Sequence, residues 1–386
     1  MFTQSAAAHE SKKAFFNVRG MLRQYAQCDY LLDFFPSETG GAAICLRYGK
    51  SGAERTLIYD TGSLKTGIAI ADYVRKRYGT DTIHDLVCSH PGPDAIAGAL
   101  PILEGLKVER LWMHRPWLHS RKIARFFASG FMFNSSVGRH YQDAFAASLA
   151  LEEAAFERNV LIKETFQGEQ IGPMVVMSPH LDWYRHRLIH DFESPHSIKR
   201  GMSYELSRLL RMPRLARSGL TDVERHDSPE NESLTEWGEV TAEMESSAVL
   251  YGAIGGQGIL LTGNAGIKAL SNAAAFAERE SLFIPSSLKF FQVPNRGDAN
   301  HLSPSVLDRF VGSGFSLLGS RPHVSAFVSI SSRYGGLPHE AVTNALNQRG
   351  ASIIQAMWGI DAVYGFPFDK AGAPREINPA WAKRHD

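Results

Sequence analysis

The sequence predicts an α/β fold, a sandwich of helices packed on β-sheet, and three features of the chain support this prediction. Short apolar runs alternate with amphipathic segments of helical spacing through most of the 386 residues. Most of these runs end in a turn signal rich in Gly, Pro, Asp or Asn. Hydrophobic residues make up 44% of the chain and charged residues 21%, which is ordinary for a globular protein and excludes a disordered or fibrous one.

Strand and helix signals alternate in the first third of the chain. The expected strands are residues 31–35, 42–47, 56–59, 85–88 and 108–113. Residues 68–78 repeat apolar side chains at helical spacing, which predicts a helix between the third and fourth of these strands. A second helix is expected to carry the apolar residues Ile96, Leu100 and Leu103.

The middle of the chain departs from this alternation. Residues of about 119–165 contain long segments without strong helix breakers, so we expect a helical insertion there. Residues of about 195–245 are polar and rich in Arg, Ser and Glu, which predicts a long connector with one helix near 204–210. Connectors of this length are usually functional or mobile. We interpret residues 1–386 as one domain that carries this insertion and this connector.

The alternation returns in the second half. The expected strands are residues 174–177, 248–253, 258–262, 290–293, 324–330 and 351–357. The second and third of these form a hairpin in our prediction, because Gly255 and Gly256 lie between them. Helices are expected after Gly266 and over 339–348, and the tail after residue 367 is expected to lie on the surface.

Charge and cysteine usage limit the partners that we expect. Lys and Arg total 41 and Asp and Glu total 40, so a formal net charge of +1 gives no field that attracts nucleic acid or an acidic membrane. Binding of nucleic acid or a nucleotide would need a local patch. The three cysteines have no C-x-x-C spacing, and no apolar stretch reaches about 18 residues. We therefore expect a cytoplasmic protein without a membrane segment.

Polar residues stand directly after several of the expected strands. Asp60, His90, Asp94, Asn264 and Asn295 all occupy such positions. Polar residues at strand ends of α/β folds often converge on one site, so these five predict a pocket. The alternative is that turns rich in Gly and Pro simply favour Asp and Asn.

The order of these motifs resembles the soluble metallo-β-lactamase-fold domain of the ComEC competence type. The resemblance rests on TLIYDTGS (56–63), VCSHPGPDAIAGALPILE (87–104), ILLTGNAG (259–266), FQVPNRGD (291–298) and FVSISSRYGGLPHEAV (327–342). It implies an αββα metallo-β-lactamase sandwich with a helical insertion. It also implies an ancestry among metal-dependent hydrolases and nucleases, whose soluble members resemble components of bacterial phage-defence systems.

The first metal motif of that family is only half present. The family pattern is His, variable, His or Asp, variable, Asp, His; His90 matches its first position and Asp94 its Asp. Gly92 stands at the second ligand position and Ala95 at the final His. An alanine there is also what an inactivating substitution would leave.

The later metal motifs are changed as well. Asn264 stands where the family has a bridging Asp, and Asn295 and Arg296 replace two imidazoles. The later His-Pro pair is absent, because His339 follows its Pro. Asn is a poor ligand for zinc and Arg binds no metal, so we expect no metal cofactor. We expect Arg296 to take the place of the metal electrically and to pair with Asp94 or Asp60.

Two hypotheses of function follow from this resemblance. The first is a catalytically inactive pseudo-hydrolase that acts as a scaffold or subunit with a protein partner, or as a homo-oligomer, through the insertion and the connector. The alternative is a phosphodiesterase or nuclease that retains one Zn, Mn or Mg ion on His90 and Asp94, with oxygen ligands from Asn264 or Asn295. In this alternative His90 and Asp94 are also the candidate catalytic residues.

The remaining histidines suggest two further groups. One group follows the strand expected at 108–113 and consists of His114, Arg115, Trp117 and His119. It predicts either a contact surface for a small ligand or nucleotide, or a solvated loop with one Trp in the core. A second group could place two imidazoles on one helical turn; it consists of His180, His186, His190 and His196. We interpret His301 and His323 as ordinary surface or hydrogen-bonded histidines.

Overall fold

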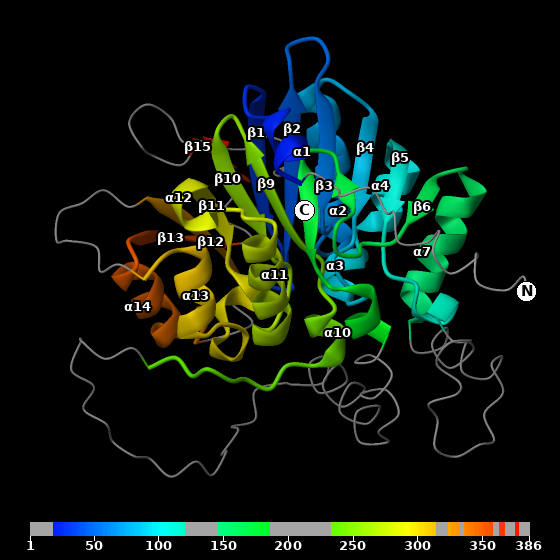
Figure 1. Cartoon of the computed structure of the whole chain (residues 1–386). Helices are drawn as coiled ribbons and strands as arrows, with labels where there is room; N and C mark the ends of the chain where they lie inside the picture. The colour runs from blue at the N-terminus through cyan, green and yellow to red at the C-terminus, as the bar shows by residue number, and fades with distance from the viewer. Residues whose placement is uncertain are drawn as a thin grey trace, which may run out of the picture.

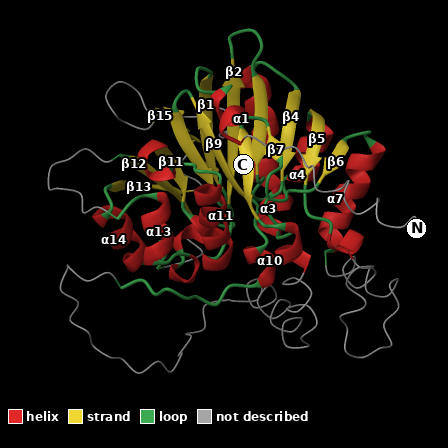
Figure 2. Ribbon diagram, viewed as in Figure 1, coloured by secondary structure: helices red, strands yellow, loops and turns green. Residues whose placement is uncertain are grey.

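Two mixed β-sheets form the centre of the protein, and helices lie outside them (Figure 1). The computed structural model describes residues 18–119, 145–185, 233–313, 323–331 and 336–357, and the backbone of 363–366 and 375–377. Figure 2 shows the strands gathered in the middle of the molecule, with helices around them. This is the α/β sandwich that the alternating signals predict.

The first sheet has the strand order β15-β14-β1-β2-β3-β4-β5-β6. Its strands are β1 (Asp29–Pro36), β2 (Ala42–Gly49), β3 (Arg55–Tyr59), β4 (Thr82–Val87), β5 (Lys107–Trp112), β6 (Leu161–Lys163), β14 (Val363–Phe366) and β15 (Arg375–Ile377). Strands β3, β4, β5 and β6 run parallel to one another, and the other neighbours pair antiparallel. The carboxyl ends of β3, β4 and β5 therefore lie along one edge.

The second sheet has the strand order β13-β12-β11-β10-β9-β8-β7. Its strands are β7 (Gln170–Ile171), β8 (Met174–Ser178), β9 (Val249–Ile254), β10 (Gln257–Leu261), β11 (Leu288–Gln292), β12 (Val324–Ile330) and β13 (Ala351–Met357). Strands β10 to β13 are parallel, and β7 to β10 pair antiparallel. The predicted hairpin is confirmed, because Gly255 and Gly256 join β9 to β10 at φ values of 58° and 75°.

Helices cover the outer face of each sheet. Those packed on the first sheet are α2 (Leu64–Tyr73), α3 (Pro93–Ile96), α4 (Ala99–Gly105) and α7 (Ala146–Glu157). Those packed on the second are α1 (Val18–Arg23), α11 (Ile267–Arg279), α12 (Ile284–Ser287), α13 (Pro304–Phe310) and α14 (Glu340–Gln348). The short helix α10 (Ala242–Glu245) contacts α11. No helix among the described residues is both long and apolar enough to cross a bilayer.

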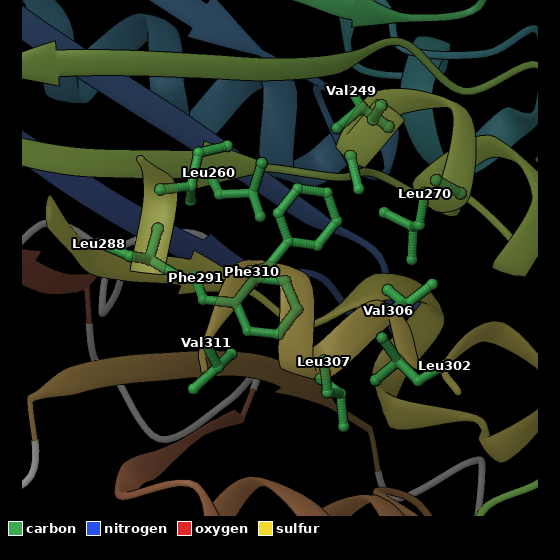
Figure 3. Packing of buried hydrophobic residues seen from close by; sticks show 14 of the residues in the cluster. Val249, Leu260, Leu270, Leu288, Phe291, Leu302, Val306, Leu307, Phe310 and Val311 are labelled. Atoms are coloured by element: carbon green, nitrogen blue, oxygen red, sulfur yellow. The ribbon is translucent and has the colours of Figure 1, made fainter. Parts of the chain in front are cut away.

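Apolar side chains fill the space between the sheets and under the helices. Between the sheets, the stacked rings of Phe290 and Phe327 lie 4.8 Å apart, and Trp112 packs in the same cluster from the first sheet. Figure 3 shows the cluster under the helices of the second sheet, where Phe310 and Leu307 of α13 contact Phe291 and its neighbours. Burial of this kind stabilises a fold by roughly 25 cal/mol per Å² of apolar surface.

The structure corrects three expectations about the elements. The helix expected over 68–78 begins earlier, at Leu64, and its last turn, Val74–Tyr78, is a π-helix. The insertion expected to be helical over about 119–165 contains α7, but residues 161–163 form strand β6, because they pair with β5. Residues 375–377 of the tail form β15 at the sheet edge. The segment 121–131 and the helix near 204–210 lie outside the described residues.

Candidate functional site

Polar residues from both sheets meet at the strand ends and form one hydrogen-bonded group, which we call the strand-end cluster. Its members are Asp60, Ser89, His90, Asp94, Asn264, Asn295 and Arg296, and each is less than a tenth exposed. Asp60 follows β3, and Ser89 and His90 follow β4, which runs parallel to it. The structure places the five strand-end residues that the sequence indicated, together with Arg296, in this cluster.

Asp60, Ser89 and His90 form the first part of the cluster. The Ser89 amide donates to Asp60 Oδ1 at 2.7 Å, and the Ser89 hydroxyl donates to Asp60 Oδ2 at 2.8 Å. Since the hydroxyl proton is directed at Asp60, the Ser89 oxygen is left to accept from His90 Nδ1, 2.9 Å away. Ser89 therefore fixes which way the imidazole ring faces.

His90, Asp94 and Asn264 form the second part. His90 Nε2 lies 3.2 Å from Asp94 Oδ1. The Asn264 amide nitrogen donates to Asp94 Oδ2 at 2.7 Å and lies 3.2 Å from His90 Nε2. Both oxygens of the Asp94 carboxylate thus face a nitrogen of a neighbouring side chain.

Asn295 and Arg296 join the cluster through the loop after β11. The Asn295 backbone N–H donates to the Gly263 carbonyl at 3.3 Å, which ties this loop to the residue before Asn264. Arg296 donates to Asn295 Oδ1 at 3.0 Å and to the Thr39 carbonyl at 3.3 Å. Asn295 Nδ2 in turn lies 2.8 Å from Nε2 of the buried His301.

The backbone of the cluster is strained at three residues. Asp60, Asn295 and Arg296 adopt φ values of 55°, 38° and 63°, a region that residues with a Cβ rarely occupy. Strain of this kind persists where the surrounding structure fixes the conformation, and it is concentrated at functional sites. The strand-end cluster is therefore the candidate functional site of the protein.

The electrostatics of the cluster centre on His90. Burial lowers the pKa of His90, but the nearby carboxylates of Asp94 and Asp60 outweigh this effect and raise the pKa to about 9. Burial raises the pKa of Asp60 to about 7, although His90 and the Ser89 hydrogen bonds oppose that rise. At neutral pH His90 is therefore an imidazolium, and its Nε2–H donates to Asp94.

The cation beside the two carboxylates differs from the expected one. Among the described residues no ion pair joins Arg296 to Asp60, and Arg296 donates to Asn295 Oδ1 and to the Thr39 carbonyl. His90 is a cation 3.2 Å from Asp94 Oδ1. The expected pairing of Arg296 with Asp60 is thus wrong. Its pairing with Asp94 stays a prediction.

Sequence reasoning missed two residues at the cluster. Ser89 stands inside a quoted motif, and its place directly before His90 was the available signal. Glu243 of α10 carried no signal, because it is 149 residues from Asp94 in a polar segment. A Cβ on Gly92 would lie 2.5 Å from His90 Nε2 and 2.8 Å from Glu243 Oε1, so the glycine leaves room for both side chains.

The residues present do not fit the metal centre that the family resemblance implies. A protonated His90 has no lone pair for a metal at Nε2, and Asn264 directs an N–H group at Asp94. Hydrolytic sites need about three protein ligands per metal. Within the part of the chain that the structure describes, no three His, Cys, Asp or Glu side chains are grouped as a metal ion requires.

The group after β5 is packed in the interior. His114 and His119 are both buried, so the interpretation as a solvated loop is wrong, while Trp117 does lie in the core as expected. His119 Nε2 lies 3.1 Å from Glu164 Oε1, and Arg115 pairs with Glu152 at 3.2 Å. Burial lowers the pKa of His114 to about 4, so its imidazole is neutral.

The other histidines do not form a second group in the described residues. His180 is exposed, and positions 186, 190 and 196 lie outside the part of the chain that the structure describes. His323 is exposed as expected, whereas His301 is buried and hydrogen-bonded.

The fold and the cluster define an α/β protein of two mixed sheets with a buried polar network at its strand ends. No protein-family model matches the chain, and no curated protein matches it.

Proposed function

We propose that the protein is a non-hydrolytic member of the metallo-β-lactamase fold that acts as a scaffold or subunit of a multi-protein assembly. One observation carries this proposal: both oxygens of Asp94 face nitrogen atoms of the protein, His90 Nε2 and Asn264 Nδ2, at 3.2 and 2.7 Å. In a hydrolase of this fold a metal ion would occupy that position. Here side-chain N–H groups neutralise and orient the carboxylate instead.

The cellular setting follows from the same resemblance. Soluble proteins of this type resemble components of bacterial phage-defence systems, which act in the cytoplasm. A near-zero net charge gives the chain no long-range attraction to nucleic acid, which favours a protein partner. Exposed apolar side chains at the edge of the first sheet, Phe156 at 79% and Leu161 at 55%, support contact with such a partner.

Metal analysis tests the proposal. Purified protein is incubated with zinc or manganese, passed through a desalting column and analysed by mass spectrometry for bound metal. We expect far less than about half an equivalent, and an unfolding temperature that excess chelator leaves unchanged. Stoichiometric metal that is lost in His90→Ala would overturn the proposal.

A restored variant provides the positive control for this assay. Ala95→His, Asn264→Asp and Asn295→His together return three ligands of the family pattern. Metal uptake by this variant alone would show that the assay detects the site and that ligand loss explains the wild-type result. Equal uptake by both proteins would contradict the proposal.

Backbone strain supports a second candidate function. Asp60, Asn295 and Arg296 retain left-handed conformations, as expected where geometry is held for chemistry. In this candidate the protein is a phosphodiesterase or nuclease with a reduced Mg or Mn site on His90 and Asp94. Turnover of bis(p-nitrophenyl) phosphate that chelator abolishes and that His90→Ala lacks would favour it over the first.

A further inference from the structure

A groove separates helix α7 from the edge strand β6, and we call it the α7–β6 groove. Figure 1 shows α7 beside β6, at the end of the first sheet. The groove has a volume of about 630 Å³, which lies within the range of about 300–1,000 Å³ of ligand-binding clefts. Its walls include Leu149, Glu153, Phe156, Glu157, Leu161 and Ile162.

Strand β6 offers an open edge to this groove. Among the strands that the structure describes, it is the last of its sheet and pairs only with β5. The Met113 amide donates to the Lys163 carbonyl at 2.9 Å, so the Lys163 backbone faces β5. The backbone N–H and C=O groups of successive residues in a strand point to opposite sides of the strand. Those of Ile162 therefore face away from β5. Neither group has a hydrogen-bond partner in the described part of the chain.

The helix wall of the groove presents apolar surface. Phe156 of α7 is 79% exposed, and Leu161 at the start of β6 is 55% exposed. An extended chain laid along β6 would gain backbone hydrogen bonds from Ile162 and apolar contact from these two side chains. The α7–β6 groove therefore has an edge strand on one side and a helix on the other, an arrangement that can bind an extended peptide.

The charge of the groove specifies the kind of peptide. Three glutamates and one arginine line it: Glu152, Glu153, Glu157 and Arg115. Arg115 is already paired with Glu152 at 3.2 Å. Glu153 has no ion pair among the described residues, and Glu157 lies 3.9 Å from Arg158. Negative charge is therefore in excess and complements lysine or arginine.

We propose that the α7–β6 groove binds an extended basic segment of a partner protein, which adds to β6 as a further strand of the first sheet. This inference rests on the proposed function, since it names the class of partner that the proposed scaffold binds. Successive side chains of an added strand point to opposite faces of the sheet. The basic residues of the segment would lie on the face that α7 covers, toward Glu153 and Glu157, and the apolar residues between them would lie on the other face, with Leu161.

A labelled peptide of about eight residues that alternates valine and lysine is the probe, and its fluorescence anisotropy measures binding. We expect binding to the full-length chain that weakens about tenfold or more in Glu153→Lys/Glu157→Lys. The matched control Glu169→Lys/Glu280→Lys reverses two charges elsewhere and should bind like the wild type. A peptide with N-methyl groups on alternate amides keeps its charge but loses its donors, so it should not bind.

The backbone contact has its own variant in the protein. Ile162→Pro removes the outward N–H, and proline is tolerated at edge positions of this kind. The Ile162 side chain also packs against the core of the first sheet, so Ile162→Ala, which loses the packing but keeps the N–H, is the matched control. Both variants should unfold at a lower temperature, but only Ile162→Pro should lose peptide binding. Equal binding of the N-methylated peptide, or equal binding by the charge-reversal variant and its control, would overturn the proposal.

The proposal would be overturned if the groove bound a second copy of the chain or the chain's own basic segment, and each case gives a distinct result. A dimer in light scattering that Glu153→Lys/Glu157→Lys dissociates would assign the groove to a second copy. Peptide binding that appears only after Arg121, Lys122 and Arg125 are changed to glutamine would assign it to the chain's own basic segment. Metal uptake would contradict the proposed function and leave this inference standing, so the two failures are distinguishable.

Discussion

Protonation of His90 should make the stability of the protein fall as pH rises above 6.5. The His90 pKa is raised to about 9 in the folded protein, against 6.5 for an ordinary histidine. A group whose pKa is raised by folding stabilises the folded state below its unfolded pKa, and this stabilisation is lost as pH rises through the folded pKa. The relevant window is therefore pH 6.5 to 9.

The two pKa values set the size of the effect. Linkage gives His90 a contribution of about 3 kcal/mol at pH 6.5 and about 1.4 kcal/mol at pH 8, so about 1.6 kcal/mol is lost between them. Asp60, with its pKa raised to about 7, adds a smaller loss of the same sign. The lowered pKa of His114 acts in the opposite direction and restores about 0.4 kcal/mol between pH 6.5 and 8. The lowered pKa values of His301 and His84 oppose the loss in the same way.

Urea unfolding of wild type and His90→Gln at pH 6.5, 7, 7.5 and 8 measures this effect. Across the series the wild type should lose about 1.6 kcal/mol more unfolding free energy than His90→Gln, because the other histidines contribute equally to both proteins. Asp94→Asn serves as a second variant, because it removes the carboxylate that raises the His90 pKa. Parallel pH profiles for wild type and both variants would refute the reasoning.

Three further changes test the packing and the cluster by unfolding free energy. Phe310→Ala should cost about 3–5 kcal/mol, because the ring is fully buried in the cluster of Figure 3, whereas Phe283→Ala at a 74% exposed site should cost less than about 0.5 kcal/mol. Arg110→Ala should cost about 3 kcal/mol, because it leaves the fully buried Asp85 carboxylate without the guanidinium 2.7 Å away. Gly92→Ala should cost about 1–3 kcal/mol, since the new methyl would lie 2.5 Å from the neighbouring imidazole nitrogen. Urea unfolding followed by circular dichroism measures the free energy of unfolding of all four variants. Equal stability of the two Phe variants would contradict the assigned packing.

The regular part of the fold was predictable because each strand is short, apolar and bounded by turn residues. The hairpin at Gly255 and Gly256 is an example, since two adjacent glycines allow the positive φ values that the turn uses. Strand β6 was missed because three residues carry no measurable periodicity. Its pairing with β5 comes from tertiary context alone.

The composition of the cluster was predictable, but its hydrogen bonding was not. Parallel strands bring their carboxyl ends together, so position in the chain was enough to gather Asp60 and His90. Asn264 follows β10 of the second sheet and reaches them because the two sheets pack face to face. The cation beside Asp94 depends on which side chains lie within about 4 Å of it, and spacing along the chain does not give that distance. Glu243 reaches the cluster from a remote segment for the same reason.

Two effects disfavour a metal ion in this cluster, the protonation of His90 and the loss of metal ligands, and they differ in size. Binding a metal at His90 at pH 7 requires release of its proton, and a pKa of about 9 makes that cost about 3 kcal/mol. A structural zinc site gains about 10–16 kcal/mol, so protonation alone would not exclude a metal. The larger loss is the ligand count, because Gly92, Ala95 and Asn264 stand where the family pattern has two imidazole or carboxylate ligands and a bridging Asp. Side-chain charge therefore stabilises the metal-free cluster, while the missing ligands are what should keep it metal-free.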